Sequence, residues 1–182
     1  MDNEKKDLPN KPQEKMALLK TKFPPIKVLE CNPRYARILS ESYAGTTSEL
    51  SAITTYLYQH HDSVDLMPEF SSLLKEIAIE EMQHFDILAE LIKLLGGDPR
   101  YHNSRGNHWT PRNIRYLTGN PYSQLLADIQ AERSAITQYR QQISHICDPY
   151  VQRILECIIQ DEERHMEIFE KLLDKFCQCP KP

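Results

Sequence analysis

The chain has 182 residues, a formal net charge of −4, 40% apolar residues and 26% charged residues. This length fits one domain with a sizeable core and is short for two. No run approaches the roughly 18 apolar residues of a membrane span, and no signal segment opens the chain, so we expect a cytoplasmic protein without a membrane partner. Basic clusters interleaved with aromatics are missing, so nucleic acid is not an expected partner.

The first 31 residues differ in character from the rest of the chain. They are rich in lysine, and four prolines interrupt any helical periodicity: Pro9, Pro12, Pro24 and Pro25. We therefore predict that residues 1–31 form a flexible or wrapping N-terminal arm.

The first two long helices follow the arm. One begins with Asn32 as a cap and Pro33 at its first position, and is predicted to run to about residue 59 with a kink at Gly45. The next is predicted from Met67 to Gly96, where glycine can adopt the left-handed conformation that ends a helix.

A long crossover and two further helices complete the predicted architecture. The segment 96–121 contains four of the five glycines and reads as the crossover. The third helix is predicted over 122–146, and the fourth begins with Asp148 as a cap and runs to about Phe176. The sequence thus predicts an all-α fold in which residues 32–177 form a four-helix bundle and 178–182 form a short tail.

The two halves of this bundle repeat each other. The stretch "ELSAITTYLYQ" from Glu49 is echoed by "ERSAITQYRQQ" from Glu132, and "EEMQHFDIL" from Glu80 is echoed by "DEERHMEIF" from Asp161. The two offsets are 83 and 81 residues (132 − 49 and 161 − 80). This pattern indicates an internal duplication of a helix pair, which a random apolar stripe would not produce.

Each repeat places acidic and imidazole side chains on the apolar stripe of its helices. Counting in helical steps from His165 reaches Glu162 and Ile158 in one direction and Phe169 in the other. An unpartnered buried carboxylate costs several kcal/mol, so a partner is required. Six residues share such positions, two as single glutamates and four as Glu-x-x-His pairs: Glu49, Glu132, Glu81, His84, Glu162 and His165.

The partner that best fits these six residues is a pair of metal ions. Four glutamates carry four negative charges, which two divalent cations would neutralise while both imidazoles stay neutral. Buried ion pairs or a solvated face are the alternatives, and both are disfavoured because no Lys or Arg recurs on the same stripes. We therefore predict two divalent metal ions, with the six residues as ligands.

Four further side chains are candidates for roles around these ligands. Tyr56 and Tyr139 each follow a single glutamate by seven residues, so their hydroxyls could bond a carboxylate or a bound oxygen species in catalysis, or they could be ordinary core aromatics. Glu80 and Asp161 each precede a Glu-x-x-His glutamate, and could either hold the outer N–H of a histidine or face solvent.

At these residues the chain resembles the ferritin-like superfamily, and within it the rubrerythrin group and the manganese catalases. The resemblance covers residues 32–176. A glutamate followed some thirty residues later by Glu-x-x-His is similar to rubrerythrins, whereas "NPRYARILSESYAGTTSELSAITTYLYQ" is similar to the opening of manganese catalases. The resemblance implies a ferritin-like bundle with a di-iron or dimanganese site, iron being the preferred metal, that acts on hydrogen peroxide or dioxygen.

Two departures from the rubrerythrin pattern bear on the reaction. Rubrerythrins have an additional glutamate one turn before the third-helix ligand, where this chain has Ile129, and they usually carry a rubredoxin domain. Here no C-x-x-C pair could hold a donor iron, and the "CQC" stretch near the end of the chain favours two free thiols over a metal-binding or redox role. A rubrerythrin-like peroxidase would therefore need an external electron-donor protein.

The sequence thus favours a rubrerythrin-like peroxidase with an external donor over manganese-catalase-like dismutation of peroxide. Non-enzymatic iron storage or a structural coat role is the alternative from another class. We expect a homo-oligomer, and a small dimer would suit the enzyme better than a hollow shell.

Overall fold

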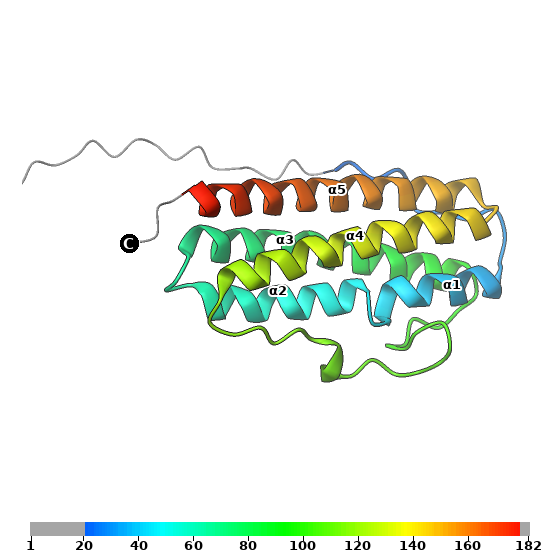
Figure 1. Ribbon diagram of the computed structural model, residues 1–182. Coiled ribbons are helices and arrows are strands. Elements are labelled where there is room, and N and C mark those ends of the chain that lie inside the picture. Colours follow the sequence, from blue (N-terminus) through cyan, green and yellow to red (C-terminus); the bar gives the residue numbers. More distant parts are fainter. Residues whose placement is uncertain (1–20, 179–182) are drawn as a thin grey trace, which may run out of the picture.

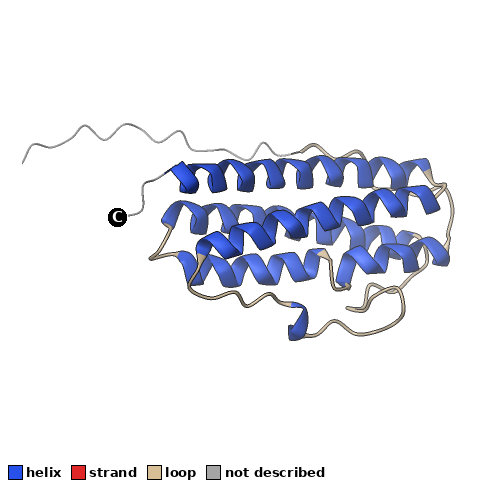
Figure 2. Ribbon diagram, viewed as in Figure 1, coloured by secondary structure: helices blue, strands red, loops and turns tan. Residues whose placement is uncertain are grey.

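The computed structural model describes residues 21–178, and within them the fold is all-helical (Figures 1 and 2). A short 3-10 turn, η1, spans Pro111–Asn113. The α-helices are α1 (Pro33–Ala44), α2 (Glu49–Ser63), α3 (Pro68–Leu94), α4 (Pro121–His145) and α5 (Pro149–Gln178). Because α1 and α2 follow each other end to end, the five helices make a four-helix bundle, as predicted.

The break between α1 and α2 corrects the prediction of one continuous helix with a kink. Residues 45–48 are not helical. The amide of Gly45 closes α1 on the carbonyl of Glu41, and the hydroxyl of Ser48 caps α2 by accepting from Ser51 N at 3.3 Å. The hydroxyls of Ser48 and Ser51 both donate to the Gly45 carbonyl, which satisfies a backbone group that the helix has released. The break therefore places Glu49 at the first turn of a new helix.

The other helix ends form as the sequence predicts. Asn32 caps α1 by accepting from the amide of Tyr35, and Asp148 caps α5 by accepting from the amide of Tyr150 at 2.9 Å. Gly96 follows α3 with φ = 81°, a conformation that glycine adopts without a steric penalty.

The bundle core is divided into two apolar clusters with polar residues between them. One cluster surrounds Leu39, Leu91 and Ile154, and the other surrounds Phe70 and Phe169. The helices α2 and α3 pack together, as do α4 and α5, so each predicted repeat is one antiparallel pair.

The crossover between α3 and α4 runs along the outside of α1 and α2 (Figure 1). Trp109 Nε1 donates to Ser51 Oγ at 3.0 Å, and Asn113 Nδ2 donates to the carbonyl of Gly45 at 3.4 Å. The amide of Arg115 donates to Thr55 Oγ1 at 3.3 Å. These contacts fix the crossover over the helix break.

The described part of the N-terminal arm wraps over the bundle. Phe23, Ile26 and Val28 pack against the core, and the amide of Leu29 donates to Asp148 Oδ2 at 2.6 Å. The rest of the predicted arm, residues 1–20, and most of the predicted tail, residues 179–182, lie outside the described residues. Within residues 21–178, no helix is long and apolar enough to cross a membrane.

Candidate metal centre

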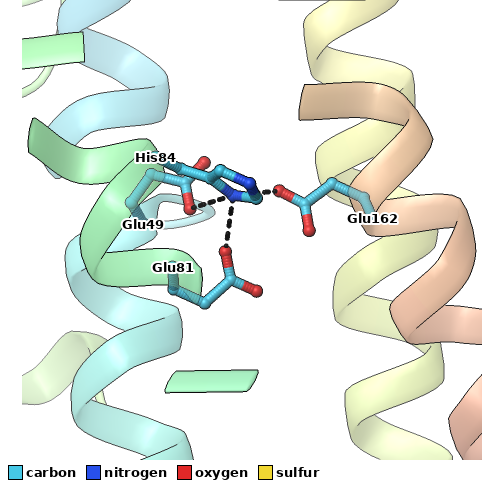
Figure 3. Close-up of side chains that lie close together, drawn as sticks. All are labelled: Glu49, Glu81, His84 and Glu162. Carbon is cyan, nitrogen blue, oxygen red and sulfur yellow. Dashed lines mark hydrogen bonds and ion pairs between the residues drawn. The ribbon is translucent and has the colours of Figure 1, made fainter. Parts of the chain in front are cut away.

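The structure brings all six predicted ligands together in the middle of the bundle. Each is at most 4% exposed. Their ligand atoms form two groups in which every atom lies within 4.8 Å of the others, and Glu81 and Glu162 belong to both groups. One group adds Glu49 and His84 to these two glutamates (Figure 3), and the other adds Glu132 and His165.

Helical spacing explains how each Glu-x-x-His pair converges. Residues three apart in a helix are surface neighbours. On α3, His84 Nδ1 lies 3.0 Å from Glu81 Oε2, and on α5, His165 Nδ1 lies 3.0 Å from Glu162 Oε2. The helices α2 and α4 each add one glutamate, so four helices contribute to one centre.

The surroundings of the histidine Nδ1 atoms indicate that this centre suits cations. His84 Nδ1 lies 3.0 Å from Glu81, 3.3 Å from Glu162 and 3.7 Å from Glu49 (Figure 3). One nitrogen carries at most one proton, so it cannot satisfy three carboxylate oxygens by hydrogen bonding. Glu81 Oε1 is buried without a hydrogen bond among the described residues, although His165 Nδ1 is 3.1 Å away. A positive ion between these atoms would satisfy them together.

The electrostatics of the cluster lead to the same conclusion. Burial raises the pKa of Glu49 well above its usual value, and the charges of Glu81 and Glu162 raise it further. Burial alone would lower the pKa of His84, yet Glu162 and its neighbours raise it well above the usual value. The core thus carries excess negative charge that attracts protons, and divalent cations would compensate it more fully. Its oxygen and imidazole donors fit iron or manganese.

Each histidine is also held by an acid from the opposite helix pair. His84 Nε2 lies 3.2 Å from Asp161 on α5, and His165 Nε2 lies 2.9 Å from Glu80 on α3. Of the two alternatives for Glu80 and Asp161, the structure thus shows contact with the outer histidine nitrogens and not exposure to solvent, so Nδ1 of each histidine faces the centre. Arg164, which the sequence analysis missed, bridges both acids at 3.0 and 2.6 Å.

The two tyrosines bond the single glutamates in a crossed arrangement. The hydroxyl of Tyr56 on α2 donates to Glu132 on α4, and that of Tyr139 on α4 donates to Glu49 on α2. Burial raises the pKa of both phenols well above the usual value, so they remain protonated donors at neutral pH. Of the alternatives that the sequence left open, these contacts show hydroxyls bonded to carboxylates, and the catalytic role of the two tyrosines stays a prediction.

A cavity of ≈ 50 Å³ lies against the centre, between α2 and α4 and under the crossover. Its wall includes the ligand glutamates, both tyrosines, and the exposed residues Thr46 and Arg115, so it connects the centre with the surface. Its wall also contains the buried acid Asp128, which the sequence analysis missed. In the sequence, Asp128 can be found as an acid that precedes the ligand Glu132 by one helical turn.

A four-helix bundle whose core holds two Glu-x-x-His pairs and two further glutamates defines a ferritin-like dimetal carboxylate protein. The family model described as the ferritin-like domain matches residues 45–178, and the chain belongs to this family.

Among its relatives is a probable manganese catalase of Clostridium acetobutylicum, 30% identical over 171 residues, covering 82% of this chain and 75% of that protein. Protein CotJC of Bacillus subtilis is 29% identical over 171 residues, covering 82% of this chain and 88% of that protein. A bacterioferritin of Desulfovibrio desulfuricans is 30% identical over 145 residues, covering 76% of this chain and 75% of that protein.

A comparison with a solved structure also shows similarity to a manganese catalase. The crystal structure of a manganese catalase from Anabaena matches with a TM-score of 0.80 and 28% identity, covering 92% of this chain and 84% of the other. These comparisons support the similarity to manganese catalases, and the resemblance to rubrerythrins remains a prediction.

Proposed function

We propose that this protein is a dimetal oxidoreductase that dismutates hydrogen peroxide, with manganese as the favoured metal. The observation that carries the proposal is the convergence of four buried glutamates and two histidine Nδ1 atoms beside a cavity that reaches the surface. The similarity to manganese catalases over most of the chain favours dismutation over the donor-dependent reaction that the sequence alone favoured.

The roles of the residues follow from the two groups of ligand atoms. Glu81 and Glu162 belong to both groups and would help to hold both ions. Glu49 and His84 would complete the ligands of one ion, and Glu132 and His165 would complete the ligands of the other. Asp161 orients the imidazole of His84, and Glu80 orients that of His165.

The bound metal pair would supply two electrons to one peroxide and recover two electrons from the next. Tyr56 and Tyr139 each hold one terminal glutamate by a hydrogen bond, which limits its rotation. Because the centre is buried between two apolar clusters, water can reach it only from the side of the cavity.

We also propose that the protein acts in the cytoplasm as a homodimer.

An oxygen electrode tests this function. Protein loaded with manganese and, separately, with iron is mixed with peroxide without a reductant. Sustained oxygen evolution from either preparation supports dismutation. Peroxide loss that requires an added rubredoxin-type donor would instead establish the peroxidase. No peroxide loss under either condition would contradict both reactions and leave metal storage or a structural role.

A further inference from the structure

Asp128 is a buried acid beside the metal centre to which no role has yet been assigned. It lies on α4, one turn before Glu132, is 1% exposed and lines the cavity. Its Oδ1 accepts a hydrogen bond from Gln59 Nε2 at 3.1 Å. Its Oδ2 is buried and has no hydrogen-bond partner among residues 21–178. An unpaired buried oxygen of this kind is costly, so it calls for a proton or for a ligand in the cavity.

The groups around Asp128 do not neutralise it by ion pairing. Arg115 is the cationic side chain on the cavity wall; it is exposed, and its Nη1 donates to the carbonyl of Ala127 at 2.9 Å. Within the described residues, Arg115 forms no salt bridge with Asp128. The other titratable groups on this wall come from α2, α3, α4 and α5, and are acids or phenols: Glu49, Tyr56, Glu81, Glu132, Tyr139 and Glu162.

These surroundings favour the neutral acid. Burial raises the pKa of Asp128 to about 8, and the hydrogen bond from Gln59 and the charge of Arg115 offset only part of this effect. The carboxyl group is therefore protonated at neutral pH, with an available donor on the oxygen that lacks a partner.

The proposed reaction requires protons to be taken up and released in turn. In one half, the O–O bond of peroxide breaks, and two electrons from the site and two protons convert it into two waters. In the other half, a second peroxide loses two electrons to the site and two protons, and leaves as dioxygen. The two protons consumed in the first half-reaction equal the two released in the second. A side chain that holds one proton between the two half-reactions would therefore make it unnecessary to exchange that proton with solvent.

We propose that Asp128 is this proton store. Its Oδ2–H gives one proton to the departing oxygen when the O–O bond breaks, and the resulting carboxylate takes a proton back from the second peroxide. Solvent exchanges the other proton through the cavity mouth beside Arg115 and Thr46. The inference rests on the proposed dismutation, and it assigns the proton chemistry of the cavity to a residue outside the ligand set.

The test compares wild-type protein with Asp128→Asn, which keeps the size of the side chain and removes its acidic proton. Asp65→Asn is the matched control, because Asp65 is exposed in the turn between α2 and α3. The first readout is the infrared C=O band of a protonated carboxylic acid in zinc-loaded protein at pH 7, where the ligand carboxylates are ionised by the metal. The band should be present in wild type and in Asp65→Asn, and missing in Asp128→Asn.

The second readout is oxygen evolution by manganese-loaded protein. General acid–base catalysis contributes about 100-fold or more, so Asp128→Asn should lower kcat by about 100-fold at unchanged manganese content, and Asp65→Asn should not. The residual rate of Asp128→Asn should rise as the pH falls, because solvent must then supply both protons.

The outcomes separate the two proposals. Equal kcat in wild type and Asp128→Asn would overturn the proton store and leave dismutation standing. Identical infrared spectra would also overturn it, whether or not the protein reacts with peroxide. A wild type that retains the infrared band but neither evolves oxygen nor consumes peroxide would contradict the proposed function, and the role of Asp128 in it.

Discussion

His84 on α3 contacts Asp161 on α5 through Nε2 at 3.2 Å, while its Nδ1 faces the neighbouring ligand Glu162 at 3.3 Å. The reciprocal contact joins His165 on α5 to Glu80 on α3 at 2.9 Å. Each half of the duplicated bundle therefore orients the histidine of the other half. A helix pair taken alone would keep its ligands and lose the acid that fixes its imidazole, so the centre depends on both pairs.

Replacing Glu162 with alanine should sharply reduce the binding of both metal ions, because Glu162 belongs to both groups of ligand atoms. Metal analysis after dialysis should give close to two ions per chain in wild type and a large loss in Glu162→Ala. Glu163→Ala is the control, since this neighbour is 43% exposed and pairs with Arg140 at the surface. A wild-type ratio near zero or one would contradict the two-metal centre.

Removing the metal should lower the melting temperature, because ions that bind only the folded state stabilise it by mass action. At a free metal concentration 100 times Kd this amounts to about 2.7 kcal/mol. Scanning calorimetry before and after chelation measures the difference, with removal checked by metal analysis. If both preparations melt at the same temperature, protons or internal contacts satisfy the buried glutamates without metal.

Asp161→Asn should weaken metal binding by about 10- to 100-fold, the usual effect of losing an acid that orients a ligand histidine. The amide would keep the shape of Asp161 but lose the charge that faces His84 and Arg164. Competition with a chelating dye gives the affinity. Asp174→Asn serves as the control, because Asp174 is exposed on the same helix, and equal affinities in all three proteins would exclude an orienting role.

Tyr139→Phe should destabilise the folded protein by about 1–3 kcal/mol, because it removes the hydroxyl that donates to buried Glu49. Urea unfolding of metal-loaded protein measures the loss. Tyr122→Phe provides a matched control on the same helix, since Tyr122 is 44% exposed. Equal midpoints for the two variants would show that Glu49 is satisfied without Tyr139.

Asp128→Asn should change how stability depends on pH. Burial raises the pKa of Asp128 to about 8 in the folded state, whereas an unfolded aspartate titrates near about 3.9. Between these values the folded state binds more protons, so the free energy of unfolding of wild type should fall as pH rises, by at most about 1.4 kcal/mol per unit.

The variant lacks this contribution, so its stability relative to wild type should increase from pH 5 to pH 8. Denaturant unfolding at several pH values measures the trend, and Asp65→Asn should run parallel to wild type. A constant difference between Asp128→Asn and wild type over this range would show that Asp128 is ionised in the folded protein.

The sequence by itself determined the six candidate ligands and the all-α bundle. Glu-x-x-His places two side chains on one helical face whatever the helix packs against, and the duplication pairs each such motif with a single glutamate. The helix caps at Asn32 and Asp148 are equally local, because a cap bonds amides only two or three residues away.

The tertiary structure decided which partner each of these residues has. Tyr56 bonds Glu132 and not the nearer-in-sequence Glu49, because α2 faces α4 across the core. The break at residues 45–48 is stabilised by the crossover, whose Asn113 bonds the Gly45 carbonyl from 68 residues away, and helix periodicity carries no information about such a contact. The sequence places Asp128 one helical turn before Glu132, but the burial of Asp128, its single hydrogen bond from Gln59 and its place on the cavity wall depend on how distant helices pack.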